Sequence, residues 1–210
     1  ELLFAERGIL AVSLREINVA AGQRNTAALH YHFQGRSGVI AAIGERHLPR
    51  IDAAQQARLQ ELFATGREDD LRGLIEAVLV PQVEYLRIGP SERAWMKISA
   101  AWVSQPNLST GKLFAAGTTS GSELRRRMVK ILAGQMPLTL ARERVFMAYT
   151  GALHALADRS RLLDVTEPTR PVLPDQAFAA NLADMFHGAL VAPVSAAVLE
   201  DLLATEGADR

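Results

Sequence analysis

The stretch SLREINVAAGQRNTAALHYHFQGRSGVIAAI, residues 13–43, decides the fold of the N-terminal part of this chain. Ser13 precedes an apolar periodic run, and Glu16 follows it three residues later. This spacing predicts a capping box, in which the serine hydroxyl and the glutamate carboxylate each accept a hydrogen bond from the other residue's backbone amide. Gly22 stands where glycine ends a helix most easily, because it adopts the left-handed conformation without strain. A first short helix is therefore predicted over residues 13–20.

A second short helix is predicted over residues 25–32, after a turn of four residues. Two such helices form a helix-turn-helix unit, in which apolar contacts hold the second helix and leave its other faces exposed. Leu14 and Ile17 supply one side of this contact and Leu29 the other. The second helix begins with small and polar residues that can approach base edges in the major groove of DNA. The candidate DNA-contacting residues are Arg24, Asn25, Thr26, Ala27, His30, Tyr31, His32 and Arg36.

Some of these residues have a second interpretation. His30 and His32 are two positions apart, so on a helix they point to nearly opposite faces and do not share a metal ion. Tyr31 either contacts a phosphate or faces the core, and Thr26 either reads a base or is a polar residue at a helix start. Arginines near the predicted recognition helix suit phosphate neutralisation, although an exposed arginine is often simply solvated.

The first 45 residues or so resemble the TetR family of bacterial transcriptional regulators. The resemblance is carried, in family order, by LFAERG, SLREI, AAG, HYHF and the Arg-Ser pair at 36 and 37. It implies a homodimer that docks two helix-turn-helix heads on a palindromic operator and holds a ligand pocket in each body. The segment from Gly22 to Phe33 is one residue longer than the family pattern. His30 stands where the family most often has tyrosine, and Arg36 stands where it has lysine.

The rest of the chain is predicted to be helical. Apolar residues recur every three or four positions, and no alternating run is long enough for a strand. We expect an all-α protein with a three-helix head at 1–45 and a larger helical body at 46–210. The sequence opens within an apparent amphipathic helix, at 1–7, so the N-terminus is expected to be incomplete. Ser37 is predicted to cap the long helix, and Pro49 and Pro81 are predicted to bend the helices that contain them. The body helices are expected near 38–64, 68–87, 91–105, 110–135, 139–161 and 174–191.

The amino-acid composition excludes some kinds of functional site. The chain has 23 basic and 23 acidic residues and no cysteine, which excludes disulfides, thiol nucleophiles and cysteine-based zinc sites. The first 50 residues carry a net charge of +2, which is a weak asymmetry. No apolar run approaches the roughly 20 residues of a membrane helix. A cytoplasmic protein without a membrane partner is expected.

Two groups of body residues are candidates for binding. Aromatic and methionine side chains at helical spacing could line an effector pocket, although such residues more often form plain core. The candidates are Trp95, Trp102, Phe114, Met147 and His154. Small and apolar residues on the last two predicted helices would let these helices pack into a four-helix dimer seam, the alternative being the subunit's own core. They are Ala148, Gly151, Ala152, Ala155, Ala183 and Phe186.

These features predict a ligand-responsive transcriptional regulator, a repressor, that binds a palindromic operator as a homodimer and is released by a small-molecule effector. No nucleophile elbow, phosphate-binding glycine loop or His-Glu-x-x-His motif appears, so neither an enzyme nor a cofactor is expected. The alternative is a helical ligand-binding or scaffold protein whose head no longer binds DNA.

Overall fold

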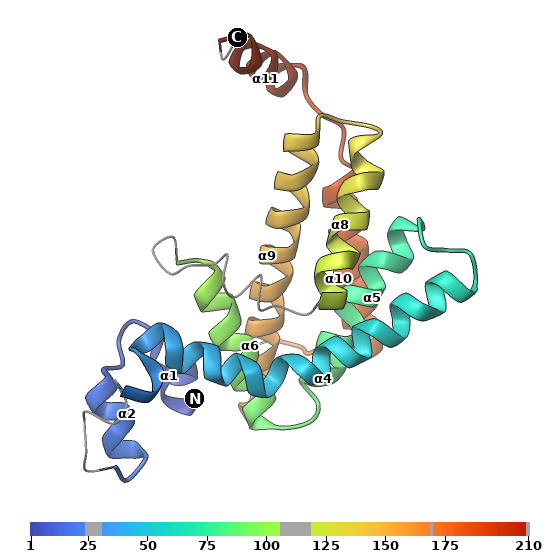
Figure 1. Cartoon of the computed structure of the whole chain (residues 1–210). Coiled ribbons are helices and arrows are strands. Elements are labelled where there is room, and N and C mark those ends of the chain that lie inside the picture. The colour runs from blue at the N-terminus through green and yellow to red at the C-terminus, as the bar shows by residue number, and fades with distance from the viewer. Residues whose placement is uncertain (24–30, 106–118, 169, 209–210) are drawn as a thin grey trace.

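The computed structural model describes residues 1–23, 31–105, 119–168 and 170–208. Within these ranges the chain is helical and contains no strand, which confirms the all-α prediction (Figure 1). Residues 106–118 lie outside the described ranges, and so does the start of the helix predicted at 110–135. The helices are α1 (Leu2–Arg7), α2 (Leu14–Ala20), α4 (Arg36–Ala64), α5 (Leu71–Tyr85), α6 (Pro90–Val103), α8 (Thr119–Ala133), α9 (Leu138–Leu163), α10 (Asp175–Val191) and α11 (Ala196–Ala208).

The start of α2 has the predicted capping box. The Ser13 hydroxyl oxygen accepts a hydrogen bond from the Glu16 amide at 3.2 Å, and a Glu16 carboxylate oxygen accepts one from the Ser13 amide at 2.8 Å. These bonds, with the Arg7 guanidinium nearby, lower the pKa of Glu16 to about 2. Gly22 has a φ of 68°, as expected for the residue that ends this helix. Both end signals read from the sequence are therefore confirmed.

The long helix begins differently from the prediction. It starts at Arg36, its N-cap is Gly35, and no side chain caps it, so the prediction that Ser37 is the cap is wrong. The chain reverses just before this start, where Gln34 has a φ of 54° and Gly35 a φ of 113°. These two left-handed residues turn the backbone directly into the helix, which leaves no extended residue at position 37. Pro49 lies inside an uninterrupted helix that runs from the head into the body (Figure 1).

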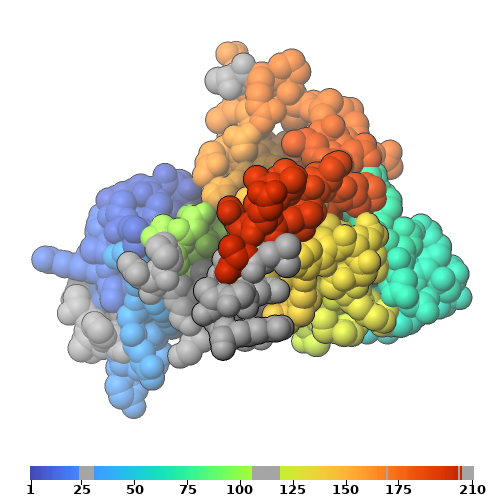
Figure 2. All heavy atoms as spheres, turned by 90° about the horizontal axis from the view of Figure 1, so that it is seen from above, coloured from blue at the N-terminus to red at the C-terminus, as the bar shows by residue number. Residues whose placement is uncertain are grey.

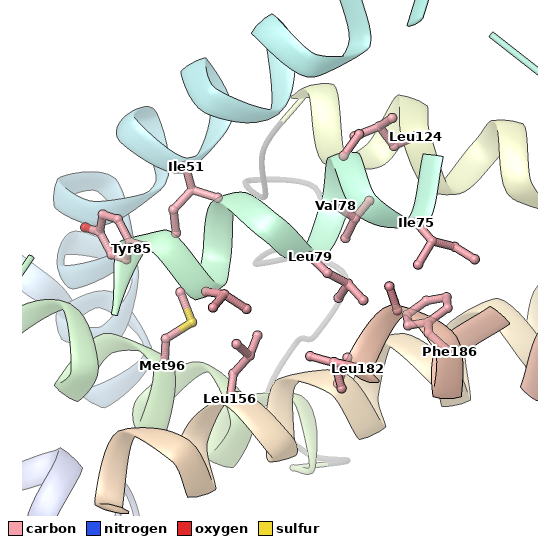
Figure 3. Close-up of a cluster of buried hydrophobic side chains, with 14 of the residues drawn as sticks. Ile51, Ile75, Val78, Leu79, Tyr85, Met96, Leu124, Leu156, Leu182 and Phe186 are labelled. Carbon is pink, nitrogen blue, oxygen red and sulfur yellow. The ribbon is translucent and has the colours of Figure 1, made fainter. Parts of the chain in front are cut away.

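Helix α5 is the centre of the body. It is apolar on nearly all sides, and a helix of this kind must be enclosed by others. Leu74, Ile75, Val78 and Leu79 are fully buried. Helices α4, α8 and α10 pack against α5, and α6 packs mainly against α9. Figure 3 shows side chains from these helices meeting around α5, including Ile51, Met96, Leu124, Leu156 and Leu182.

The C-terminal end contains a helix that the sequence analysis did not predict. Figure 1 shows α11 beyond the ends of α9 and α10, and in Figure 2, seen from above, it is the red segment nearest the viewer. None of the described helices is by itself long and apolar enough to cross a membrane; α10 together with the first part of α11 passes that test only across a 59° bend.

Candidate functional site

The candidate DNA-contacting segment ends in an exposed aromatic turn. Residues 31–33 are helical, and Tyr31 is 85 % exposed. Its ring lies edge-on to that of His32, at 5.4 Å between centroids. Tyr31 therefore does not face the core, which was the alternative interpretation. The other candidates in this segment, Arg24, Asn25, Thr26, Ala27 and His30, lie outside the described residues.

The aromatic turn packs tightly on the start of α4. A Cβ atom placed on Gly38 would lie 1.6 Å from the Phe33 carbonyl oxygen, so no larger residue fits without moving the backbone. Gly38 is thus the residue that allows the end of the segment to approach the long helix. The sequence analysis did not identify it, because nothing in its neighbourhood distinguishes this glycine from an ordinary helical one.

Arg36 joins the start of α4 to the loop between α1 and α2. Its guanidinium donates hydrogen bonds to the carbonyl oxygens of Val12, at 2.9 Å, and Leu10, at 3.2 Å. The side chain is partly buried. These bonds hold the loop of the head against the long helix, a role that the sequence analysis did not foresee when it assigned Arg36 to a phosphate.

A buried polar network connects the head to the body. The His47 side chain on α4 is 2 % exposed, with Nδ1 2.7 Å from the Tyr85 hydroxyl and Nε2 3.0 Å from a Glu1 carboxylate oxygen. The Ser91 hydroxyl donates to the same carboxylate oxygen at 2.9 Å. The Trp95 ring stacks on His47, with 5.4 Å between ring centroids and 5° between planes. The His47 imidazole therefore links Glu1, which precedes α1, to Tyr85 on α5 and Trp95 on α6.

The partners of His47 fix its protonation state. Burial lowers the pKa of His47, although the Glu1 carboxylate opposes this shift. Burial also raises the pKa of Tyr85 to about 12, so its hydroxyl stays protonated. A carboxylate only accepts hydrogen bonds, so Nε2 of a neutral imidazole donates to Glu1 and Nδ1 accepts from Tyr85. Sequence reasoning missed this network because its members are up to 90 residues apart and carry no motif.

The predicted effector residues separate into two groups. Trp95 and Trp102 are buried on α6, at 2 % and 3 % exposed. Met147 and His154 lie exposed on the surface of α9, so these four side chains do not share one buried interior. They share a face because they are seven residues apart, and Nε2 of His154 is 2.8 Å from the Ser104 hydroxyl. Phe114 lies outside the described residues.

Among the described residues, three buried polar atoms of the α6–α9 pair have no hydrogen-bond partner. They are the indole Nε1 of Trp102, the hydroxyl oxygen of Thr150 and the Nε of Arg159. Helices α6 and α9 pack extensively against each other. Buried donors and acceptors in proteins are nearly always paired, so these atoms are exceptions to the usual pattern.

The residues predicted to form the dimer seam differ in burial. Ala152, Ala183 and Phe186 are buried in the subunit's own core, and Ala148 and Ala155 pack against it in part. These five therefore belong wholly or partly to the intramolecular alternative, and only Gly151 is exposed. The same two helices present other residues outward, which we call the outer face of α9 and α10. Its members are Met147, Gly151 and His154 on α9 and Asn181, Met185 and Gly188 on α10.

The part of the chain that the structure describes contains no group of three histidine, aspartate or glutamate side chains arranged to hold a metal ion. No protein-family model matches this sequence, and a search of curated proteins finds no match.

Proposed function

We propose that the protein is a ligand-responsive transcriptional regulator, a repressor, that binds a palindromic DNA operator as a homodimer. The observation that carries the proposal is the exposed aromatic turn at residues 31–33, held against α4 by the close approach at Gly38. A recognition element must protrude and still be fixed in orientation, because its contacts with base edges depend on register. The TetR-like motifs of the first 45 residues support the same reading.

The polar groups of this turn suit a DNA backbone. The hydroxyl of Tyr31 is exposed and can donate to a phosphate oxygen, and His32 is exposed beside it. The bonds from Arg36 to the α1–α2 loop and the capping box of α2 keep the head rigid. A rigid head reduces the conformational entropy lost on binding.

The outer face of α9 and α10 supports self-association. Met147 and Met185 are 63 % and 65 % exposed. Gly151 follows Met147 by four residues on α9, and Gly188 follows Met185 by three residues on α10. Exposed large apolar side chains next to glycine allow two helices to approach closely. Two copies of this helix pair would form a four-helix seam and present two heads to successive turns of DNA, about 34 Å apart.

The unpaired polar atoms of the body support an effector site. Trp102 offers one hydrogen-bond donor and belongs to the apolar core, and Thr150 offers one donor and acceptor on α9. A mainly apolar ligand with one or two hydrogen-bonding groups satisfies this surrounding. Trp95, seven residues before Trp102 on α6, stacks on His47 of α4. Movement of α6 on ligand binding would therefore reach the helix that carries the head.

A gel-shift assay against the DNA flanking the protein's own coding region tests the proposal. We expect sequence-dependent retardation at low salt and a steep loss of affinity as salt rises, because neutralised phosphates release counterions. Tyr31→Ala should weaken binding, whereas Phe63→Ala, an exposed aromatic near the other end of α4, is the matched control. If no sequence-dependent retardation occurs at low salt, the alternative of a scaffold or ligand-binding protein with a degenerate head is favoured.

A further inference from the structure

A shallow basic groove lies between α8 and α9. Its volume is about 350 Å³, and the described residues that line it include three arginines and no acidic residue. The Arg125 guanidinium lies over the Tyr149 ring, at 4.7 Å from the centroid. The nearby Glu123 pairs with Arg126 and Arg127. We call this the α8–α9 groove; it is lined by Ser122, Arg125, Arg126, Val129, Arg142, Val145, Phe146 and Tyr149.

Helix α11 has the opposite charge. Its sequence, AAVLEDLLATEGA, contains three acidic residues and no basic one. Glu200 and Asp201 are exposed, and so are the apolar side chains of Val198 and Leu199. A helix of 13 residues is marginal in water on its own and needs tertiary packing to persist. An acidic helix with exposed apolar residues is complementary to a basic groove with an apolar floor.

The linker before α11 is bound to α9 through Arg144. The Arg144 guanidinium donates hydrogen bonds to the carbonyl oxygens of Leu190, at 3.0 Å, and of Ala192. These bonds fix the chain at the end of α10. No described element packs extensively against α11, which lies beyond the ends of α9 and α10 (Figure 1).

We propose that α11 of one subunit docks in the α8–α9 groove of a second copy of the chain. The inference rests on the homodimer of the proposed function. Phe146 lines the groove, and its neighbour Met147 belongs to the outer face of α9, so the groove borders the proposed seam. Helix α11 follows α10, which supplies the other part of that face. Twofold symmetry would then bury two helices in two grooves.

Cysteine cross-linking tests this proposal directly, because the chain has no cysteine of its own. One chain carries Ser122→Cys in the groove, and a second, of different length through a tag, carries Leu199→Cys in α11. The two are co-refolded and treated with a bis-maleimide reagent. We expect a product that contains both chains. Val165→Cys, which is exposed on the loop after α9, replaces Ser122→Cys in the matched control and should give little product.

Two results would overturn the proposal. One is the absence of the mixed product beyond the level of the control. The other is that a chain carrying both cysteines cross-links only within itself, which would mean that α11 folds back onto its own groove. Charge reversal provides an independent readout: Arg142→Glu should raise the dimer dissociation constant by about five-fold, and Glu200→Arg should restore it in the double variant. Equal weakening by both reversals without rescue contradicts the proposal.

The outcome is separable from that of the proposed function. Sedimentation of the wild-type chain reports whether a dimer forms at all, and gel shift reports whether it binds DNA. A mixed cross-link without DNA binding would support the docking of α11 and count against the regulator. DNA binding by a dimer that does not give the mixed cross-link would support the regulator and count against the docking of α11.

Discussion

Replacing His47 with glutamine should change how the protein's stability depends on pH. The imidazole is buried between the Tyr85 hydroxyl and the Glu1 carboxylate, and burial lowers its pKa below the ordinary value of 6.5. The unfolded chain therefore binds a proton at a higher pH than the folded chain does. Between these two pKa values the free energy of unfolding rises with pH, and it falls as the solution is acidified.

The size of this pH dependence follows from the uptake of one proton by His47 on unfolding. The slope for a single group is at most about 1.4 kcal/mol per pH unit, and it applies from about pH 6.5 down to the folded pKa of His47. Carboxylates such as Asp70, Glu123 and Asp164 have lowered pKa values. Their contributions are lost only below their ordinary pKa of about 4 to 4.5, so they do not affect this window.

The assay is urea unfolding followed by circular dichroism at pH values from about 7.5 to 5.5. His47→Gln should lower the free energy of unfolding at pH 7.5 by about 1–3 kcal/mol, because the substitution disturbs buried hydrogen bonds. Its stability should then fall less steeply on acidification than that of the wild type. His154→Gln, at the surface, is the control and should keep the wild-type slope. Parallel curves for His47→Gln and the wild type would refute the argument.

Four other substitutions have expected outcomes. Gly38→Ala should weaken DNA binding and lower thermal stability, because its Cβ would lie 1.6 Å from the Phe33 carbonyl oxygen; gel shift and calorimetry measure these effects. Leu79→Ala should lower the free energy of unfolding in urea by about 2–5 kcal/mol, through the cavity it leaves in the core. Met185→Asp should weaken self-association by about ten-fold or more in sedimentation equilibrium, because it places a charge in the proposed seam. Trp102→Phe should lower the free energy of unfolding in urea by less than about 2 kcal/mol, because removing a buried donor without a partner offsets part of the cost of the smaller ring.

Local sequence signals predicted the helices well. The capping box at Ser13 and the left-handed Gly22 are set by residues within a few positions of each other, so the sequence contains the whole of their cause. The start of α4 was harder to predict. Two consecutive left-handed residues, one of them Gln34, turn the chain there, and a non-glycine residue with positive φ gives no sequence signal.

The site was less predictable because it depends on contacts distant in sequence. Periodicity shows that Met147 and Ala152 lie on different faces of one helix, but it does not show which face is covered. In the structure Ala152 is buried and Met147 is exposed. The His47 network needs Tyr85 and Glu1 to meet across the head–body junction. Helix α11 was missed because residues 196–208 follow a proline-containing linker, and none of its described side chains belongs to the buried core.

The central claim is that two copies of this chain read an inverted repeat in duplex DNA. Selection of binding sites from a random DNA pool by the full chain tests it most directly. The account predicts recovered sequences with two symmetric half-sites centred about one helical turn apart, bound by two chains per site, and a loss of enrichment for Tyr31→Ala. Recovery of no common sequence, or of a single half-site bound by one chain, would contradict it.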